Sequence, residues 1–335
     1  MVVFTGASTS VMYGYEAQFG TANTSPANLT NTFGLNTKVS TLSLSTNRQQ
    51  LNKLGQVEPS KFAYGTQSGS LSIGFVMDSG DSHKIFQSIY GTANGTSPFK
   101  YPAALGQGMT QATFANQSFT TQIQLATGTS THLLRTLNGC IVNSLNISTS
   151  IGEPLNCSAD ITFGKEVTAN VAVGSAITSQ RTGSGVDQGL TPYTFAHGEV
   201  KVHNGTQLTA VAEIQEFDIS FAQNAELLYG LNSQTAIDAY RKVFEISGRF
   251  RTTFKDDRMI QYVIDQSRVN TSASELITSG VGIELTFTNG SQSILIKLEE
   301  LSVADHNVSG IEPAEPVFEE INWSCKSAQI QVTAS

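Results

Sequence analysis

The chain has 335 residues, of which 39% are hydrophobic and only 14% are charged, and its formal net charge is −8. This length accommodates one large domain or two domains of ordinary size. The acidic balance and the lack of a basic stripe exclude a protein that grips nucleic acid through its phosphates, because such proteins concentrate Lys and Arg. A sequence so poor in charge is typical of a turn-rich β protein, or of one whose faces are buried against copies of itself.

The first twenty residues lack a charged segment followed by an apolar block, so we expect no signal peptide. No apolar run approaches the ~18 residues that a membrane-spanning helix needs, so we expect no membrane association. Cys140, Cys157 and Cys325 are too few and too scattered for a disulfide framework or a zinc site. We therefore expect three buried core thiols in a protein made in a reducing compartment, the host cytoplasm.

The most informative feature is internal similarity between the two halves of the chain. The aligned segments are Leu42–Ser45 with Phe217–Ser220, Asp81 with Asp256, and Glu153–Leu155 with Glu315–Val317. Their common order predicts two tandem copies of one plan, with a first β domain at residues 1–170, a linker at 171–192 and a second β domain at 193–335. The alternative is that two β-rich stretches of similar composition align by chance.

In the first copy, alternation of apolar and polar residues predicts strands at Val39–Leu44 and Leu71–Phe75, joined by a long polar connection at 47–69. The apolar spacing then changes, and Asp81–Gly91 predicts a short amphipathic helix with an Asp near its start as a cap. The polar, Gly-rich stretch 92–131 is expected to be a loop or an extended hairpin.

Two long strands, Cys140–Ile147 and Leu155–Phe163, are predicted to close the first copy. The second copy repeats the plan, with one short helix at 256–264 and a polar connection at 223–242. Its predicted strands are Val211–Phe221, Val243–Phe250, Ile283–Thr288, Ile294–Leu301 and Val317–Ser324. Asn289-Gly290 is a two-residue hairpin signal between two of these strands. The predicted fold class is mainly β, sandwich-like, with one short α-helix per repeat.

No catalytic constellation emerges from the ionisable residues. His197 and His203 could share a strand face, but a metal site needs a third ligand and Glu199 is the only nearby candidate, so solvated histidines are the better interpretation. The carboxylate pairs are adjacent in sequence and face opposite ways on a strand. The glycines of residues 183–189 lack the spacing of a dinucleotide loop. We expect no catalytic residue, no cofactor and no metal.

Three passages resemble the tail tube proteins of long-tailed phages and archaeal tailed viruses. The opening Tyr13–Ala22 contains Glu16-Ala-Gln-Phe19-Gly20-Thr21, which is similar to a start common in that family. The others are Leu137–Ser148 with Gly152–Leu155, and Phe195–Val202 followed by Phe217–Asn224. Together the three passages touch most of the chain, although no single motif is diagnostic.

The resemblance implies two packed antiparallel sheets flanked by a helix, with copies joined edge to edge around a lumen. It implies a virion structural protein that forms stacked rings, through which DNA passes transiently and without specific binding during ejection. The duplication adds that three chains would form each ring with pseudo-sixfold symmetry, and a ring of six whole chains is the alternative. The implied partners are other copies of the chain and the tail terminator, tape measure and distal tail proteins, with the virion tail as the location.

Under this hypothesis, polar residues of the barrel strands line the lumen, because a neutral or acidic wall lets DNA slide. The candidates are Ser43, Ser45, Ser72, Asp218 and Ser220. The two polar connections and the N-terminal arm are expected to make the ring-to-ring contacts. The candidates there are Asn47, Gln56, Lys61, Asn224 and Asn232.

Three other interpretations stay open at this point. One is the inner tube, or another ring component, of a contractile injection machine. A second is a cell-surface or adhesion β protein, which the missing export signal disfavours. A third is a carbohydrate-acting β-sandwich enzyme, which the single tryptophan (Trp323) and the lack of an isolated carboxylate pair near aromatic residues disfavour.

Overall fold

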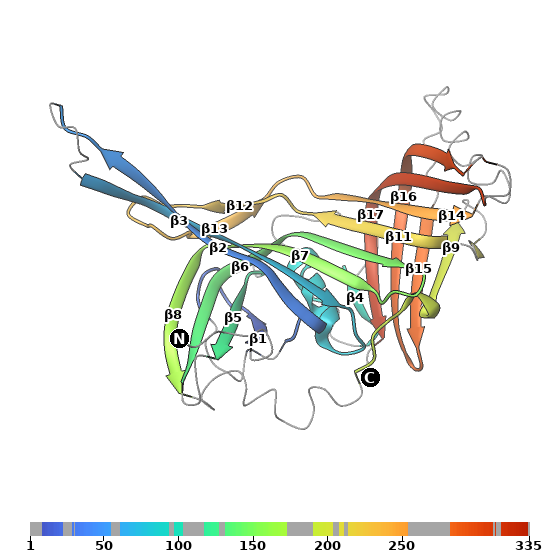
Figure 1. Cartoon of the computed structure of the whole chain (residues 1–335), viewed down its shortest axis with the longest axis horizontal. Helices are drawn as coiled ribbons and strands as arrows, with labels where there is room; N and C mark the ends of the chain where they lie inside the picture. Colours follow the sequence, from blue (N-terminus) through green and yellow to red (C-terminus); the bar gives the residue numbers. More distant parts are fainter. Residues whose placement is uncertain are drawn as a thin grey trace.

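The computed structural model describes residues 9–22, 29, 31–54, 61–93, 97–102, 117–126, 131–172, 190–203, 208–210, 214–253, 282–310, 312 and 316–333. These residues form a protein made almost entirely of antiparallel strands (Figure 1). The predicted mainly β fold class is therefore confirmed.

The strands of the first half are β1 (Thr9–Tyr15), β2 (Leu35–Leu51), β3 (Lys61–Val76), β4 (Phe99–Tyr101), β5 (Phe119–Ala126), β6 (Thr131–Ser150), β7 (Asn156–Phe163) and β8 (Lys165–Ala172). Those of the second half are β9 (Gly198–His203), β10 (Leu208–Ala210), β11 (Ile214–Ala222), β12 (Ala225–Leu228), β13 (Asp238–Arg241), β14 (Glu245–Thr253), β15 (Gly282–Asn289), β16 (Gln292–Ser309) and β17 (Phe318–Thr333). A 3-10 turn at Asp81–Phe86 leads into the short helix α1 (Gln87–Tyr90).

One sheet runs through both halves in the order β10-β9-β15-β16-β17-β14-β11-β6-β7-β3-β2. The halves meet where β6 pairs with β11, from Ser144 opposite Ala222 to Ser150 opposite Glu216. The predicted division into two domains stays a prediction, and most of the predicted linker lies outside the described residues. The two halves nevertheless share one backbone hydrogen-bond ladder where they meet.

Long strands carry the chain from one layer of the molecule to the other. The first part of β6 pairs with β5 and β8, whereas its second part pairs with β7 and β11. Figure 1 shows β2, β3, β7, β11 and β14 running across the upper layer, with β1, β5, the helical segment and the lower parts of β16 and β17 beneath them. One side of the upper layer therefore faces the core, and the other side does not.

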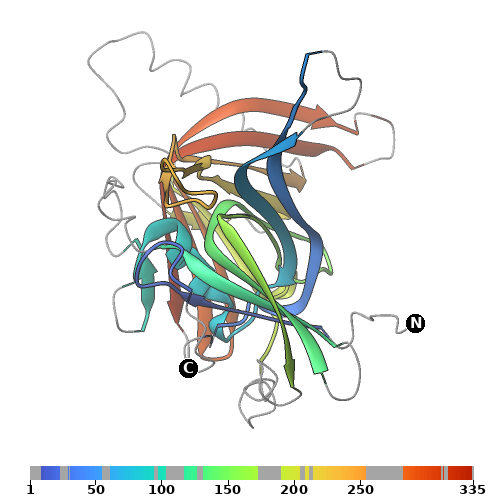
Figure 2. The ribbon, with the colours of Figure 1, turned by 90° about the vertical axis from the view of Figure 1, so that its left-hand side faces the viewer.

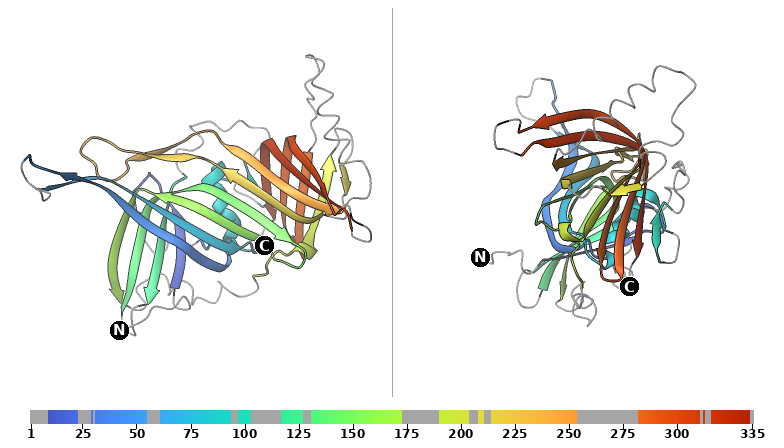
Figure 3. Two further views of the ribbon diagram at one scale, coloured as in Figure 1. Left: turned by 45° about the horizontal axis from the view of Figure 1, so that its top comes forward. Right: turned by 90° about the vertical axis from the view of Figure 1, so that its right-hand side faces the viewer.

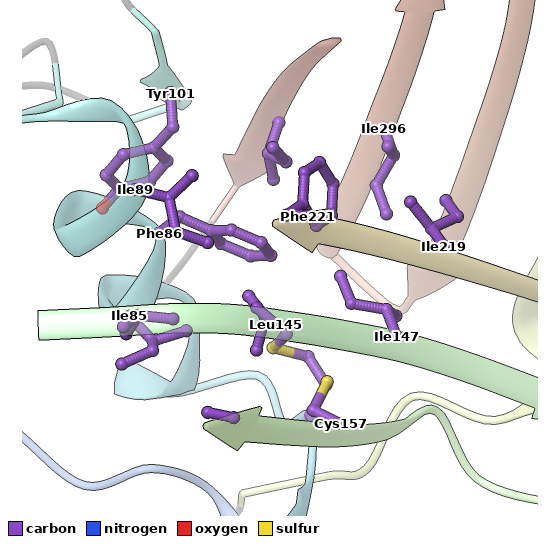
Figure 4. Close-up of a cluster of buried hydrophobic side chains, with 14 of the residues drawn as sticks. Ile85, Phe86, Ile89, Tyr101, Leu145, Ile147, Cys157, Ile219, Phe221 and Ile296 are labelled. Carbon is purple, nitrogen blue, oxygen red and sulfur yellow. The ribbon is translucent and has the colours of Figure 1, made fainter. Parts of the chain in front are cut away.

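The core lies between these layers, and α1 packs beneath the junction of the two halves. Leu145 and Phe221, from the two strands of that junction, are fully buried together with Phe86 and Ile89 of the helical segment (Figure 4). The rings of Phe86 and Phe221 meet edge to face, with centroids 6.3 Å apart. The hydroxyl of Ser88 accepts a hydrogen bond from the Val142 backbone N–H at 3.3 Å.

The first predicted helix is confirmed, but its capping differs from the prediction. The carboxylate of Asp81 pairs with Lys84 at 2.8 Å, and no side chain caps the first turn. Gly91 ends the helix with φ 89°, a conformation that favours glycine. The second predicted helix, at 256–264, lies outside the described residues.

The polar connections contain more strand than the sequence analysis expected. Residues 47–69 largely extend the β2–β3 hairpin, and residues 223–242 contain the β12–β13 hairpin. The stretch 92–131 contributes β4 and β5, of which β5 forms a hairpin with β6. Of the three cysteines, all free thiols, Cys140 and Cys157 are buried as expected, whereas Cys325 is half-buried.

Candidate assembly surfaces

The upper layer presents a continuous polar surface on the side away from the core. Cross-strand partners share a face of a sheet, so the register defines which side chains lie together. This polar face consists of Ser43, Ser45, Ser68, Ser70, Ser72, Ser144, Asn146, Ser148, Ser158, Asp160, Thr162, Asp218, Ser220, Ser247, Arg249, Asn322 and Ser324. It spans β2, β3, β7, β6, β11, β14 and β17, and Figure 3 (left) turns this layer toward the viewer.

All five residues that the sequence analysis assigned to a lumen lie on the polar face. Ser43 and Ser45 are exposed on β2, whereas Ser72, Asp218 and Ser220 are half-buried on β3 and β11. β3 and β11 are far apart in the chain, but their residues lie on one surface because β7 and β6 lie between these strands in the sheet and continue the same alternation.

Hydrogen bonds between neighbouring strands order the polar face. The carboxylate of Asp160 accepts hydrogen bonds from the hydroxyls of Ser72 at 2.6 Å and Ser144 at 3.0 Å. The hydroxyls of Ser43 and Ser70 are 2.7 Å apart. These hydrogen bonds pair polar groups of the face with one another, so those groups are less available to bind a passing molecule.

The charge on this side of the sheet is weakly acidic. In the described part of the sheet its carboxylates, Asp160, Glu216, Asp218, Glu245, Asp305 and Glu320, outnumber its cations, Lys38, Arg249 and Arg251. Arg249 donates to Glu216 at 2.7 Å, which neutralises its charge locally. Burial raises the pKa of Asp218, an effect that Arg249 opposes and Glu216 reinforces.

Two hairpins project from one end of the molecule and carry exposed apolar side chains. They lie beside each other (Figure 2), joined by hydrogen bonds from the Gln67 N–H to the Gln234 carbonyl and from the Tyr229 hydroxyl to the Gln67 carbonyl, both at 2.7 Å. We call this the hairpin cluster, and its exposed apolar side chains are Leu51, Leu54, Phe62, Tyr64, Leu228, Leu231 and Ile237. So much exposed apolar surface in one place is typical of a protein interface.

Four of the five residues assigned to ring stacking lie on or next to these same projections. Asn47 and Lys61 are exposed on β2 and β3. Asn224 and Asn232 are exposed around β12 and have positive φ angles of 49° and 69°. Gln56 lies outside the described residues.

The Glu-x-x-Phe-Gly passage near the N-terminus forms a buried polar anchor. The carboxylate of Glu16 accepts hydrogen bonds from the backbone N–H groups of Gly20 (2.8 Å) and Gly139 (2.9 Å). It also accepts from the hydroxyls of Ser118 (2.7 Å) and Thr120 (2.8 Å). These hydrogen bonds connect the segment after β1 to β5 and β6. The Glu-x-x-Phe-Gly passage therefore has a structural role that the sequence analysis did not find.

Two of the residues considered for metal binding, His197 and Glu199, make local contacts. The Nδ1 atom of His197 lies 3.2 Å from both the backbone nitrogen and the hydroxyl of Thr194, and Glu199 pairs with Lys201 at 2.8 Å. Within the described ranges, no three His, Cys, Asp or Glu side chains are grouped to hold a metal ion. No helix in the same ranges is long and apolar enough to cross a membrane.

Comparison with known proteins gives a family for this β-rich chain. A family model described as phage tail tube protein matches residues 6–325. No curated protein matches the chain significantly. The match covers nearly the whole chain and confirms the resemblance drawn from the three sequence passages. Tail tube proteins are structural components of the virion tail and not enzymes. The chain therefore belongs to the phage tail tube protein family.

Proposed function

We propose that this protein is the repeating subunit of a tail tube, that its copies close into rings, and that the stacked rings form the channel for DNA during ejection. The structural role in the virion tail follows from the family. The observation that carries the finer proposal is the polar face, which extends over strands of both halves, with Ala222 and Ile141 as apolar residues on the same side.

The polar face is proposed to line the lumen. Its hydroxyls and amides are uncharged, and its carboxylates outnumber its cations. DNA carries a dense row of phosphate charges, so a Lys-rich wall would hold it, whereas a weakly acidic wall repels it and lets it slide. The opposite side of the same strands packs against the core, where side chains such as Leu71, Ile147 and Ile219 are fully buried.

Three chains are proposed to complete one ring, with six chains as the alternative. The first half of the sheet runs β2-β3-β7-β6 and the second half runs β11-β14-β17-β16, and this order supports the proposal that each chain contains one strand arrangement twice. Three such chains would supply six similar segments, because a ring forms when a head-to-tail interface closes on rotation.

Stacking of rings is proposed to use the hairpin cluster. Leu54 and Leu231 are fully exposed at its tips, and Phe62 and Tyr64 are 55% and 62% exposed. Burying these side chains against the next ring would remove apolar surface from water. A stack built in one direction has different faces at its two ends. We propose that the tail terminator and the distal tail proteins cover these ends, and that the tape measure protein occupies the lumen.

Electron microscopy of the purified full-length chain, together with its mass in solution, tests this proposal. Hollow rings or tubes are expected, and each ring should contain three chains of 35.8 kDa. Rings of six equal chains would contradict the threefold closure but keep the tube function. A protein that stays monomeric at high concentration, even when offered preformed tube ends, would contradict the function itself.

A further inference from the structure

The two halves share an irregularity that fixes how their strands correspond. The β6–β7 ladder shifts register between Val142 and Ser144. The β16–β17 ladder shifts in the same way between Val303 and Asp305. A β-bulge is a specific local feature rather than a general property of strands, so these two positions can be treated as equivalent.

The equivalence of the two bulges defines equivalent residues on four strands in each half. In the first half, Leu42, Leu71, Ile161 and Val142 lie in one cross-strand row. In the second half the corresponding row is Ile219, Gly248, Trp323 and Val303. Leu42 therefore corresponds to Ile219, whereas the sequence alignment placed it on Phe217, two residues earlier on the same face.

The junction inside the chain joins the last strand of the first set to the first strand of the second. In it Ile147 lies opposite Ile219, and Asn146 lies opposite Ser220. Ile147 and Ile219 are fully buried on the core side, whereas Asn146 and Ser220 are half-buried on the polar face. The junction thus joins core side to core side and polar side to polar side.

The same two strands of the plan form open edges at the ends of this arrangement. Residues 41–45 of β2 pair with β3 alone, and residues 305–309 of β16 pair with β17 alone, as far as the described residues extend. Each edge exposes an apolar side chain that points to the core side, with Leu44 42% exposed and Val308 37% exposed. Open edges of this kind pair readily with another strand.

We propose that β2 of one chain pairs antiparallel with the end of β16 of a second copy, in the register of the internal β6–β11 junction. Equivalent positions then place Leu42 opposite the partner's Val308 on the core side. They place Ser43 opposite the partner's Asn307 on the polar face. The inference rests on the proposed tube function and adds to it the contacting strands and their register.

The two edges are complementary in chemistry as well as in position. Leu42 and Val308 would form an aliphatic pair, as Ile147 and Ile219 do inside the chain. On the other side, Ser43 and Asn307 can exchange hydrogen bonds. A slip by one residue would place the polar side chain of Asn307 opposite Leu42 on the core side, so the alternation favours one register.

Paired cysteines test the register in assembled full-length protein. The in-register variant carries Ser43→Cys with Asn307→Cys, and the matched control carries Thr41→Cys with Asn307→Cys. Directly opposite residues have Cβ atoms ~4.5–5.5 Å apart and diagonal ones ~7–8 Å. Oxidation, or a short thiol cross-linker, should join chains at least ~10-fold more efficiently in the first variant, given that gap and the distances that a disulfide tolerates.

The outcomes separate the register from the function. Tubes that cross-link only in the control pair, or in neither pair, would overturn the proposed junction while the tube function stands. A wild-type protein that never assembles would overturn both.

A second pair of variants keeps the test decisive if the cysteines disturb assembly. Val308→Asp should leave the monomer folded and raise the concentration needed for assembly at least ~10-fold, because the junction would bury an unpaired carboxylate. Val308→Ile should assemble as the wild type does. Unimpaired assembly of the Val308→Asp variant would contradict the junction.

Discussion

Replacing Glu16 should destabilise the fold more than its position near the N-terminus suggests. The carboxylate is 3% exposed and accepts four hydrogen bonds. In Glu16→Ala, the hydroxyls of Ser118 and Thr120 can rotate, but the N–H groups of Gly20 and Gly139 cannot. Each backbone donor left unpaired costs ~1–3 kcal/mol, and removing the buried carboxylate offsets part of that cost because its desolvation is relieved. We therefore expect the free energy of unfolding to fall by ~2–4 kcal/mol.

Glu16→Gln should lose less, ~1–2 kcal/mol, because one oxygen still accepts from Gly139 while the new NH2 group faces the Gly20 donor. Denaturant unfolding of the monomer, comparing midpoints at constant slope, measures both losses. Glu245→Ala removes an exposed carboxylate and should stay within ~0.5 kcal/mol of the wild type. A Glu16→Ala variant as stable as that control, or a Gln variant that loses as much stability as the Ala variant, would refute this role of Glu16.

Burial lowers the pKa of His83 to about 4, below ~6.5 in the unfolded chain. The contribution of the neutral His83 side chain to the free energy of unfolding is therefore fully present above pH ~6.5. Up to ~3 kcal/mol of that free energy is lost as the pH falls toward 4. His83→Gln should flatten that part of the stability curve, and an unchanged slope would contradict the assignment. A methyl group added at Gly248 would lie 2.4 Å from a tryptophan ring, whereas one at Gly74 would have no atom nearer than 3.9 Å. Thermal unfolding should thus show Gly248→Ala destabilised by ~1–3 kcal/mol and Gly74→Ala almost unaffected, and equal losses would refute this packing argument. Phe62→Ser with Tyr64→Ser should leave the monomer stable and rings of normal mass, but shorten or abolish tubes in electron micrographs. Full-length tubes from that variant would exclude the hairpin cluster from stacking.

Period-2 alternation is why much of the sheet could be predicted from the sequence. Successive side chains of a strand point to opposite sides of the sheet, so Leu42 and Leu71 on the core side place Ser43 and Ser72 on the side away from the core. In the same way, Ile219 on the core side places Asp218 and Ser220 on the other side. It could not reveal that all four share one surface, because that depends on β6 and β7 lying between them in the strand order.

The parts that the sequence analysis missed lack the pattern on which it relied. In β5, Thr120, Thr121, Gln122 and Gln124 are all buried, so the strand shows no contrast between an apolar and a polar side. The outer part of β2 is exposed on both sides and likewise lacks alternation. The role of Glu16 depends on donors more than a hundred residues away in the chain, which no local pattern contains.

The central claim is that the polar face forms the inner wall of a tube. Cryo-electron microscopy of assembled tubes, at a resolution that traces the strands, tests it most directly. We predict that the side chains of Asp160 and Ser220 point into the lumen, on a wall where each chain contributes two similar segments. A reconstruction in which this face lies on the outer surface, or between stacked rings, would contradict the account.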